Sequence, residues 1–246
     1  MDTLELPTVG QLVAEKPARS RVFERLGIDY CCGGKKSLDT VCAEKGLNPQ
    51  DVMRDLDACE VSISDARDWL HASLGELADH IEKTHHALMK RELPRMAELI
   101  ARVARVHGSQ HPEIVKVEEI FHHFRAELEQ HMQKEEQILF PICRQLESAT
   151  SLPAFHCGSI CNPIRVMESE HNDAGAAMRA FRQLTNGYTL PEGVCRSYQA
   201  MLAGLADIES DMHQHVHKEN NILFPRAIDL ETKLTNKANG RYLSNS

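Results

Sequence analysis

The sequence predicts an all-α protein in which a small helical domain precedes an up-down four-helix bundle. Long segments between residues 66 and 230 carry apolar residues at helical spacing, and no segment alternates as a half-buried strand would. An eleven-residue sequence also occurs twice, as HMQKEEQILFP at 131–141 and HVHKENNILFP at 215–225, with seven identical positions. The repeat indicates that the bundle is built from two related halves.

The N-terminal domain is predicted to span residues 1–62. Four short segments there have apolar residues at helical spacing and are separated by glycine and proline, which break helices. Ser37 and Asn48 stand where helix N-caps belong. A polar linker, EVSISDARD at 60–68, is expected to join this domain to the bundle.

The bundle domain is predicted to span residues 66–230. Four amphipathic helices joined by two short connections and one longer one are typical of such a bundle. The expected helices run over 66–106 with a kink at Pro94, from Pro112 to about 147, from Pro163 to the TNGYTLPEG sequence, and over 192–228. The polar tail, residues 231–246, is predicted to be disordered.

Composition excludes several classes of partner. The net charge is −8 and the basic residues form no cluster, which argues against nucleic acid. No apolar run approaches the ~18 residues of a membrane span, and the N-terminus lacks the pattern of a signal peptide. We therefore expect a cytoplasmic protein whose eight cysteines are mostly free thiols.

The repeated sequence carries a histidine and a glutamate four residues apart, at His131 and Glu135 and again at His215 and Glu219. This spacing places both side chains on one face of a helix. Two such glutamates facing an apolar core without a cation would cost a large burial free energy. The pattern therefore indicates a metal site inside the bundle.

Each half also supplies a lone histidine on its first helix. His86 lies 45 residues before His131, and His171 lies 44 residues before His215. Antiparallel helices would bring His86 and His131 to nearly the same height in the bundle. Two metal ions could then each take two imidazoles and share two bridging carboxylates, with room for an oxo or hydroxo group. This mixed ligation favours iron or manganese over zinc.

Other interpretations of these residues are less well supported by the sequence. A single histidine on an apolar face is usually not a ligand, but a repeated set of six residues is a stronger signal. The ferritin-type di-iron bundle uses Glu-x-x-His, which differs from the His-x-x-x-Glu found here. The remaining histidines fall outside the aligned repeat. The acidic residues that share the ligand stripe or flank it could contact the ligands or line a channel, namely Glu127, Glu168, Glu170 and Asp211.

The motifs DYCCGGKKSL, HMQKEEQILFP, VMESEH and HVHKENNILFPRA stand in this order in the chain. With them the chain resembles the repair-of-iron-centres family of di-iron proteins, from residue 8 to about 228. The resemblance implies a hemerythrin-like bundle that holds two non-haem iron ions. The ligands implied are His86, His131, Glu135, His171, His215 and Glu219, with the two glutamates bridging. Hemerythrins themselves use a fifth histidine, for which only the distant His107 is available.

The same resemblance implies a vicinal cysteine pair, Cys31 and Cys32, in the N-terminal domain. The sequence YCCGG predicts a tight turn that exposes the pair, and two lysines follow it. Adjacent cysteines are poorly placed for an ordinary disulfide. Neighbouring lysines would lower the thiolate pKa, so we interpret the pair as reactive, against the alternative of two structural thiols.

The family's role is the repair or protection of iron-sulfur clusters damaged by nitric oxide or oxidative stress, with damaged iron-sulfur proteins as clients. The chain is thus expected to bind nitric oxide or oxygen and to act by nitric oxide handling, iron donation, or both. Two alternatives stay open. One is a hemerythrin-type sensor or carrier of nitric oxide or oxygen, which would need no reactive thiols. The other is a nitric oxide reductase, which would turn over with an electron donor.

Overall fold

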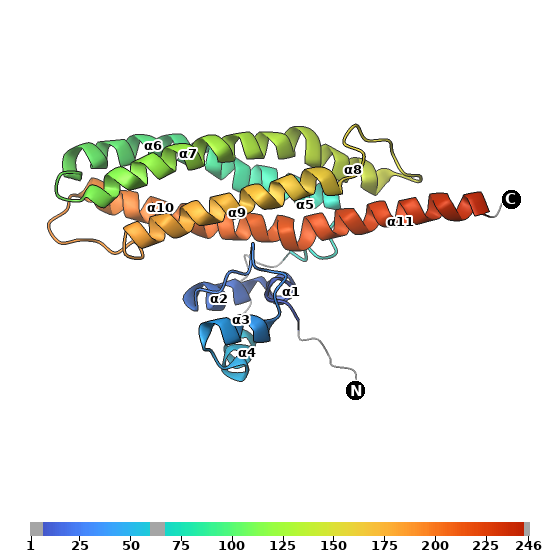
Figure 1. The fold of residues 1–246 in the computed structure, drawn as a ribbon, viewed down its shortest axis with the longest axis horizontal. Coiled ribbons are helices and arrows are strands. Elements are labelled where there is room, and N and C mark those ends of the chain that lie inside the picture. Colours follow the sequence, from blue (N-terminus) through green and yellow to red (C-terminus); the bar gives the residue numbers. More distant parts are fainter. Residues whose placement is uncertain (1–6, 60–66, 244–246) are drawn as a thin grey trace.

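The computed structural model describes residues 7–59 and 67–243, with side chains as far as residue 237. The chain is helical throughout this part, and the one extended pairing found among the described residues is an isolated bridge between Thr8 and Ser37. Long helices form a bundle, and a group of short helices lies on one side of it (Figure 1). The all-α prediction is confirmed.

The N-terminal domain consists of short helices that begin at polar caps. Thr8 forms a reciprocal capping box with Gln11, and the predicted caps Ser37 and Asn48 each accept a hydrogen bond from a backbone amide of the helix that follows. These bonds satisfy amides that have no partner within the helix. The elements are α1 (Val9–Glu15), η1 (Pro17–Arg19), α2 (Ser20–Arg25), α3 (Leu38–Lys45) and α4 (Pro49–Asp57).

The bundle is formed by four long rods, three of which contain a short π-helical segment. Neighbouring rods pack as α6 against α7 and α10, and α7 against α9 (Figure 1). The first rod is α5 (Leu74–Ile81), η3 (Glu82–His86) and α6 (Ala87–His107), and the second is α7 (Pro112–Lys134), η4 (Glu135–Leu139) and α8 (Phe140–Ser148). The third is α9 (Cys161–Leu184), and the fourth is α10 (Arg196–Lys218), η5 (Glu219–Leu223) and α11 (Phe224–Leu243).

The first rod begins later than the sequence suggested, at Leu74 instead of residue 66. Ser73 and Glu76 form a capping box there, which fixes the start of the helix. Helix α6 continues through Pro94 to His107. The predicted linker at 60–68 falls mostly outside the described residues.

The tail expected to be disordered from residue 231 is helical as far as Leu243. Its polarity was misleading because two of its residues are anchored. The buried Glu231 carboxylate accepts hydrogen bonds from the Ser159 hydroxyl and the Ile160 amide, at the start of α9. Leu234 packs into the apolar cluster at the same end of the bundle. These contacts extend α11 past the predicted end of the domain.

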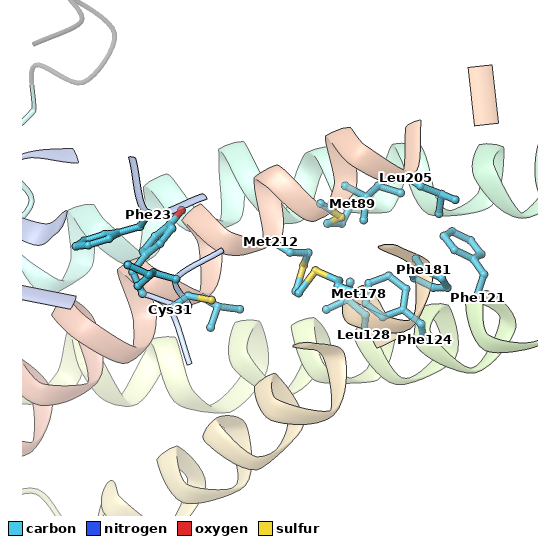
Figure 2. Packing of buried hydrophobic residues seen from close by; sticks show 14 of the residues in the cluster. Phe23, Cys31, Met89, Phe121, Phe124, Leu128, Met178, Phe181, Leu205 and Met212 are labelled. Atoms are coloured by element: carbon cyan, nitrogen blue, oxygen red, sulfur yellow. The ribbon is translucent and has the colours of Figure 1, made fainter. Parts of the chain in front are cut away.

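Two apolar clusters fill the bundle, one toward each end. One includes Leu77, Phe140 and Phe224, and the other extends from Met89 to Phe181 and continues into the N-terminal domain. Figure 2 shows Phe23 and Cys31 of that domain with the bundle residues of this second cluster. The domain is therefore packed onto the bundle by apolar burial. Among the described helices, none combines the length and the apolar character that crossing a membrane requires.

Candidate metal centre

Wide π-helical turns occur in three rods where the predicted ligands lie. In η4 and η5 the amides of Phe140 and Phe224 bond to the carbonyls of Glu135 and Glu219, five residues earlier. A proline follows each phenylalanine. Because proline has no N–H and its ring crowds the carbonyl four residues before it, a regular α-helical turn is disfavoured there. Such π segments are often found at functional sites.

The six predicted ligands lie together in the bundle as two groups of four. Within each group, the potential ligand atoms lie within 4.8 Å of one another. Each group takes one histidine from each half of the bundle, and both glutamates belong to both groups. The groups are His86, Glu135, His215 and Glu219, and His131, Glu135, His171 and Glu219.

The histidine nitrogens converge on the two carboxylates. The Nε2 atoms of His86 and His215 are 3.1 Å apart, and those of His131 and His171 are 3.0 Å apart. Glu135 Oε2 lies 3.4 Å from His86 Nε2 and 3.3 Å from His131 Nε2. The shared carboxylate thus stands between histidines of the two groups, which is the arrangement that a bridging ligand requires.

The cluster is buried, and several of its polar atoms have no hydrogen-bond partner. Both glutamate side chains are 0% exposed. Neither carboxylate oxygen of Glu135 accepts a hydrogen bond, and Glu219 Oε2 also has no hydrogen-bond partner, although imidazole nitrogens lie 3.2 to 3.4 Å away. Buried carboxylates whose oxygens lack hydrogen bonds are costly unless a cation neutralises them. The residues therefore fit a metal centre, and their imidazole and carboxylate donors suit iron.

The surrounding imidazoles favour the ionised form of both carboxylates, whose pKa values are lowered in spite of burial. Burial acts to raise the pKa of Glu219, but the imidazoles of His215 and His171 outweigh burial and hold it well below its usual value. Burial likewise opposes the charged form of His131, and Glu135 overcomes it and raises the pKa of His131 to about 10. A bound metal ion would take the place of the imidazole protons as the positive charge that balances the two carboxylates.

Two of the predicted ligand histidines are oriented by acidic residues. His86 Nδ1 donates to Glu136 Oε1 at 2.7 Å, and Lys90 also donates to that carboxylate. His131 Nδ1 donates to Glu170 at 2.8 Å, and Lys134 pairs with the same residue. Because a carboxylate accepts hydrogen bonds, Nδ1 carries the proton in both rings. The Nε2 atoms are then left free to bind a metal.

The other two ligand histidines have different surroundings. His171 Nδ1 lies 2.9 Å from the Asn220 side-chain oxygen, whereas His215 Nδ1 has no hydrogen-bond partner. The ring of His85 stacks on that of His215, with centroids 5.4 Å apart. His85 bonds to Asp211, one of the acidic residues on the ligand stripe.

The sequence predicted that Glu170 could contact a ligand histidine, but it did not predict the contacts of Glu136 and Asn220. Glu136 and Asn220 occupy the same position of the repeat, directly after Glu135 and Glu219. Their shared polar character beside an apolar sequence was the available signal. Its meaning depends on the π-helical turns, which the sequence pattern did not indicate.

A hollow of about 230 Å³ reaches one of the two groups. Its lining includes the ligands His131 and His171, and the predicted channel residue Glu127. Phe124 and Leu128 contribute apolar surface to it. The group that contains His131 and His171 therefore lies beside an opening large enough for a small molecule.

The vicinal cysteines lie at the contact between the domains. The Asp29 carboxylate accepts backbone hydrogen bonds from Cys31, Cys32 and Gly33, which shapes the turn. Cys32 Sγ lies 3.6 Å from the carbonyl oxygen of His171. The loop thus places the Cys32 thiol against helix α9, which carries the predicted ligand His171.

Two expectations for this pair were wrong. Cys31 is buried, 4% exposed, and Cys32 is half-buried, so the turn does not expose both thiols. The contact with Cys32, followed by burial, raises the pKa of Cys31 well above its usual value. The lysines do not lower it, because Lys35 and Lys36 pair with Glu168 and Glu44 instead.

The other histidine and glutamate residues considered from the sequence lie apart from the two groups of four side chains. His107 is at the far end of α6, where its Nε2 contacts Cys195 Sγ at 3.2 Å, so it is not a fifth ligand in this structure. Glu168 pairs with Lys35 of the N-terminal domain. His217 is buried at the domain contact, where its ring packs on Tyr30.

Comparison with known proteins is consistent with this geometry. Residues 77–227 match the hemerythrin HHE cation binding domain, and residues 6–60 match ScdA_N, a domain of unknown function. The iron-sulfur cluster repair protein YtfE of Pectobacterium atrosepticum is 35% identical over 225 residues, covering 90% of this chain and 96% of that protein.

Two further relatives are similarly close. A probable iron-sulfur cluster repair protein of Haemophilus influenzae is 34% identical over 224 residues, covering 90% of this chain and 96% of that protein. YtfE of Escherichia coli O157:H7 is 35% identical over 222 residues, covering 89% and 96%. With its buried histidine and glutamate cluster, its hemerythrin HHE domain and these relatives, the chain belongs to the repair-of-iron-centres family, the family of the YtfE-type iron-sulfur cluster repair proteins.

Proposed function

We propose that the protein holds two non-haem iron ions, one at each group of four residues. Glu135 and Glu219 would bridge the two ions, His86 and His215 would bind one, and His131 with His171 would bind the other. The sharing of both glutamates by both groups supports this assignment. The carboxylate oxygens that lack hydrogen-bond partners support it independently.

In this proposal the protein repairs or protects iron-sulfur clusters that nitric oxide or oxidative stress has damaged. Bound iron would supply a binding site for nitric oxide or oxygen and a source of iron for the damaged cluster. The protein's own residues would exclude bulk water from the centre and admit a small molecule through the hollow beside His131 and His171. Damaged iron-sulfur proteins would be the clients, as the names of the relatives suggest.

The position of the vicinal thiols is the observation that carries this proposal. Cys32 Sγ lies 3.6 Å from the His171 carbonyl oxygen, on the helix that supplies a ligand. A pocket of about 250 Å³ between the domains is lined by both cysteines, Arg179 and His213. A sensor or carrier would need no thiols beside its metal centre. Once deprotonated, a cysteine placed here could accept iron, because thiolates are good ligands for the iron of iron–sulfur sites.

The test is reactivation of a nitric-oxide-damaged [4Fe–4S] enzyme at matched iron loading. The double variant Cys31→Ser, Cys32→Ser should keep its iron but lose most of its capacity to reactivate the enzyme. The control is Cys161→Ser, which removes an exposed thiol outside the domain contact and should reactivate as the unaltered protein does. Equal reactivation by the double variant would refute the role of the thiols.

Nitric oxide reduction is the second candidate, and the hollow beside the ligands favours it because it admits a small molecule. Anaerobic addition of nitric oxide to the reduced protein, with an electron donor present, separates the candidates. Sustained nitrous oxide formation with retained iron identifies a reductase. Iron loss without turnover identifies a donor, and reversible binding alone identifies a sensor or carrier.

A further inference from the structure

Asn220 links a predicted metal ligand to the thiol-bearing loop. Its side-chain oxygen lies 2.9 Å from His171 Nδ1, and its side-chain nitrogen donates to the carbonyl oxygen of Cys31 at 3.4 Å. Asn220 is 7% exposed and His171 1% exposed, so water does not compete freely for these groups. One amide therefore touches both the bundle's metal centre and the N-terminal domain.

The direction of these hydrogen bonds follows from the chemistry of the groups. The Cys31 carbonyl can only accept a hydrogen bond, so the Asn220 NH₂ group must face it. The Asn220 oxygen then faces His171, so the proton must be on His171 Nδ1. With Nδ1 protonated, the neutral ring presents a lone pair at Nε2, which is the nitrogen that lies 3.2 Å from Glu219 Oε2.

We propose that Asn220 is a positioning residue through which the backbone of the thiol-bearing loop sets the tautomer of His171. This inference rests on the proposed metal binding and extends it. Docking of the loop orients the amide, the amide fixes the ring, and the ring offers Nε2 to the metal. A residue that orients a ligand in this way normally strengthens metal binding.

The link has a thermodynamic consequence. If loop docking favours metal binding, metal binding must favour loop docking by the same factor. The other outer partners do not extend to the loop, because Glu136 pairs with Lys90 and Glu170 with Lys134. Among the four predicted ligand histidines of the described residues, His171 is thus the one that a hydrogen-bonded side chain connects to the backbone of the thiol-bearing loop.

Asn221 provides a matched control. Its side-chain nitrogen donates to the carbonyl oxygens of Tyr30 and Cys31 at 3.1 and 3.2 Å and lies 3.1 Å from His217 Nδ1, and none of these groups is a predicted metal ligand. The loop also approaches it closely, since an added Cβ at Gly34 would lie 2.2 Å from its side-chain oxygen. Asn221 therefore contributes to docking alone, whereas Asn220 contributes to docking and to the ligand.

The experiment measures alkylation of Cys31 and Cys32 by iodoacetamide in the full-length protein. Rates are compared between the metal-free protein and protein loaded anaerobically with iron(II) and then desalted. The exposed Cys195 in the same sample serves as the reference thiol. In the unaltered protein, iron should slow alkylation of the pair by roughly fivefold or more, the lower end of ordinary coupling.

Asn220→Asp keeps an acceptor for His171 but removes the donor to Cys31. It should retain iron while the effect of iron on alkylation falls to nearly none. Asn221→Leu should speed alkylation in both states and leave their ratio unchanged. Far-UV circular dichroism and the Cys195 rate confirm that each variant is folded.

If iron slows alkylation of the cysteine pair in Asn220→Asp as much as in the unaltered protein, the inference is overturned, because the metal then shields the thiols by another route. The inference is also overturned if Asn221→Leu loses the effect of iron on the alkylation rate to the same extent as Asn220→Asp. If the unaltered protein binds iron but its Cys31 and Cys32 are alkylated no more slowly, this inference is wrong while the proposed metal centre stands. Failure of the unaltered protein to bind iron defeats both this inference and the proposed metal centre.

Discussion

The two halves of the bundle supply the same ligand types but surround them differently. Residues 74–148 contribute a lone histidine and a His-x-x-x-Glu pair, and residues 161–243 contribute the same set. The position after the shared glutamate is Glu136 in one half and Asn220 in the other. Glu136 connects its histidine to a lysine, whereas Asn220 connects its histidine to Cys31.

A second position differs in the same way. The residue before the lone histidine is His85 in the first half and Glu170 in the second. Glu170 accepts a hydrogen bond from ligand His131, but His85 only stacks on ligand His215. The repeat therefore fixes the donor atoms, while the residues that differ between the halves decide how firmly each ring is held.

The largest expected effect comes from the residues that the two groups share. Glu219→Leu should remove most of the iron from both positions, because each group of four contains this carboxylate. His215→Leu alters one group and should leave about half of the iron in place. Iron per chain, measured by mass spectrometry after anaerobic loading, distinguishes the two outcomes.

Glu136→Gln is the control for that comparison, since it changes a half-buried acidic residue beside His86 without removing a proposed ligand. It should retain both irons when iron is in excess. Complete loss of iron in His215→Leu would show that the two positions do not fill independently. Retention of two irons in Glu219→Leu would contradict the bridging assignment.

A smaller effect should separate the outer partners of the two halves. Glu170→Gln should weaken iron binding roughly 10- to 100-fold, the usual result of removing a hydrogen-bonded partner of a ligand histidine. His85→Gln, at the matching position, should have a smaller effect because His85 donates no hydrogen bond to His215. Anaerobic titration with iron(II) against a chelator gives both affinities. Equal weakening would show that stacking orients His215 as firmly as a hydrogen bond orients His131.

The helical fold and the grouping of the six histidine and glutamate side chains could be anticipated from periodicity and from the repeat. Spacing of four residues on a helix fixes which side chains share a face, whatever the loops do. The assignment of histidines to groups was not predictable, because it depends on which helices are neighbours. His86 pairs with His215 on the fourth rod, although the sequence aligned its height with His131.

The thiol pair was harder to predict than the metal cluster. A glycine-rich turn followed by lysines suggests an exposed pair with a low thiolate pKa. The lysines instead form ion pairs with Glu168 and Glu44, and Cys31 is buried against the bundle. Burial at a domain contact depends on residues far apart in the chain, which local sequence patterns do not report.

The halves also differ at the far end of the bundle, where their second helices begin. The N-cap residue of helix α7 is His111, whereas that of α10 is the exposed Cys195. The backbone N–H of Tyr198, and then His107, lower the pKa of Cys195 to about 7. A thiol with a lowered pKa is ionised above that pH, and the thiolate is the reactive form.

The smallest and most local prediction follows from this contrast. The alkylation rate of Cys195 should rise with pH and reach half its maximum near pH 7. Cys31 should react slowly over the same pH range, because the contact with Cys32 and then burial raise its pKa. His107→Ala should move the midpoint for Cys195 upward, toward the ordinary value of 9.0, but not fully to it because the Tyr198 amide remains. Mass spectrometry of the alkylated Cys195 peptide across the pH series gives the midpoint in the unaltered protein and in the variant.

An unchanged midpoint in His107→Ala would assign the lowered pKa of Cys195 to the helix terminus alone. Changed iron content in this variant would contradict the separation of His107 from the metal centre.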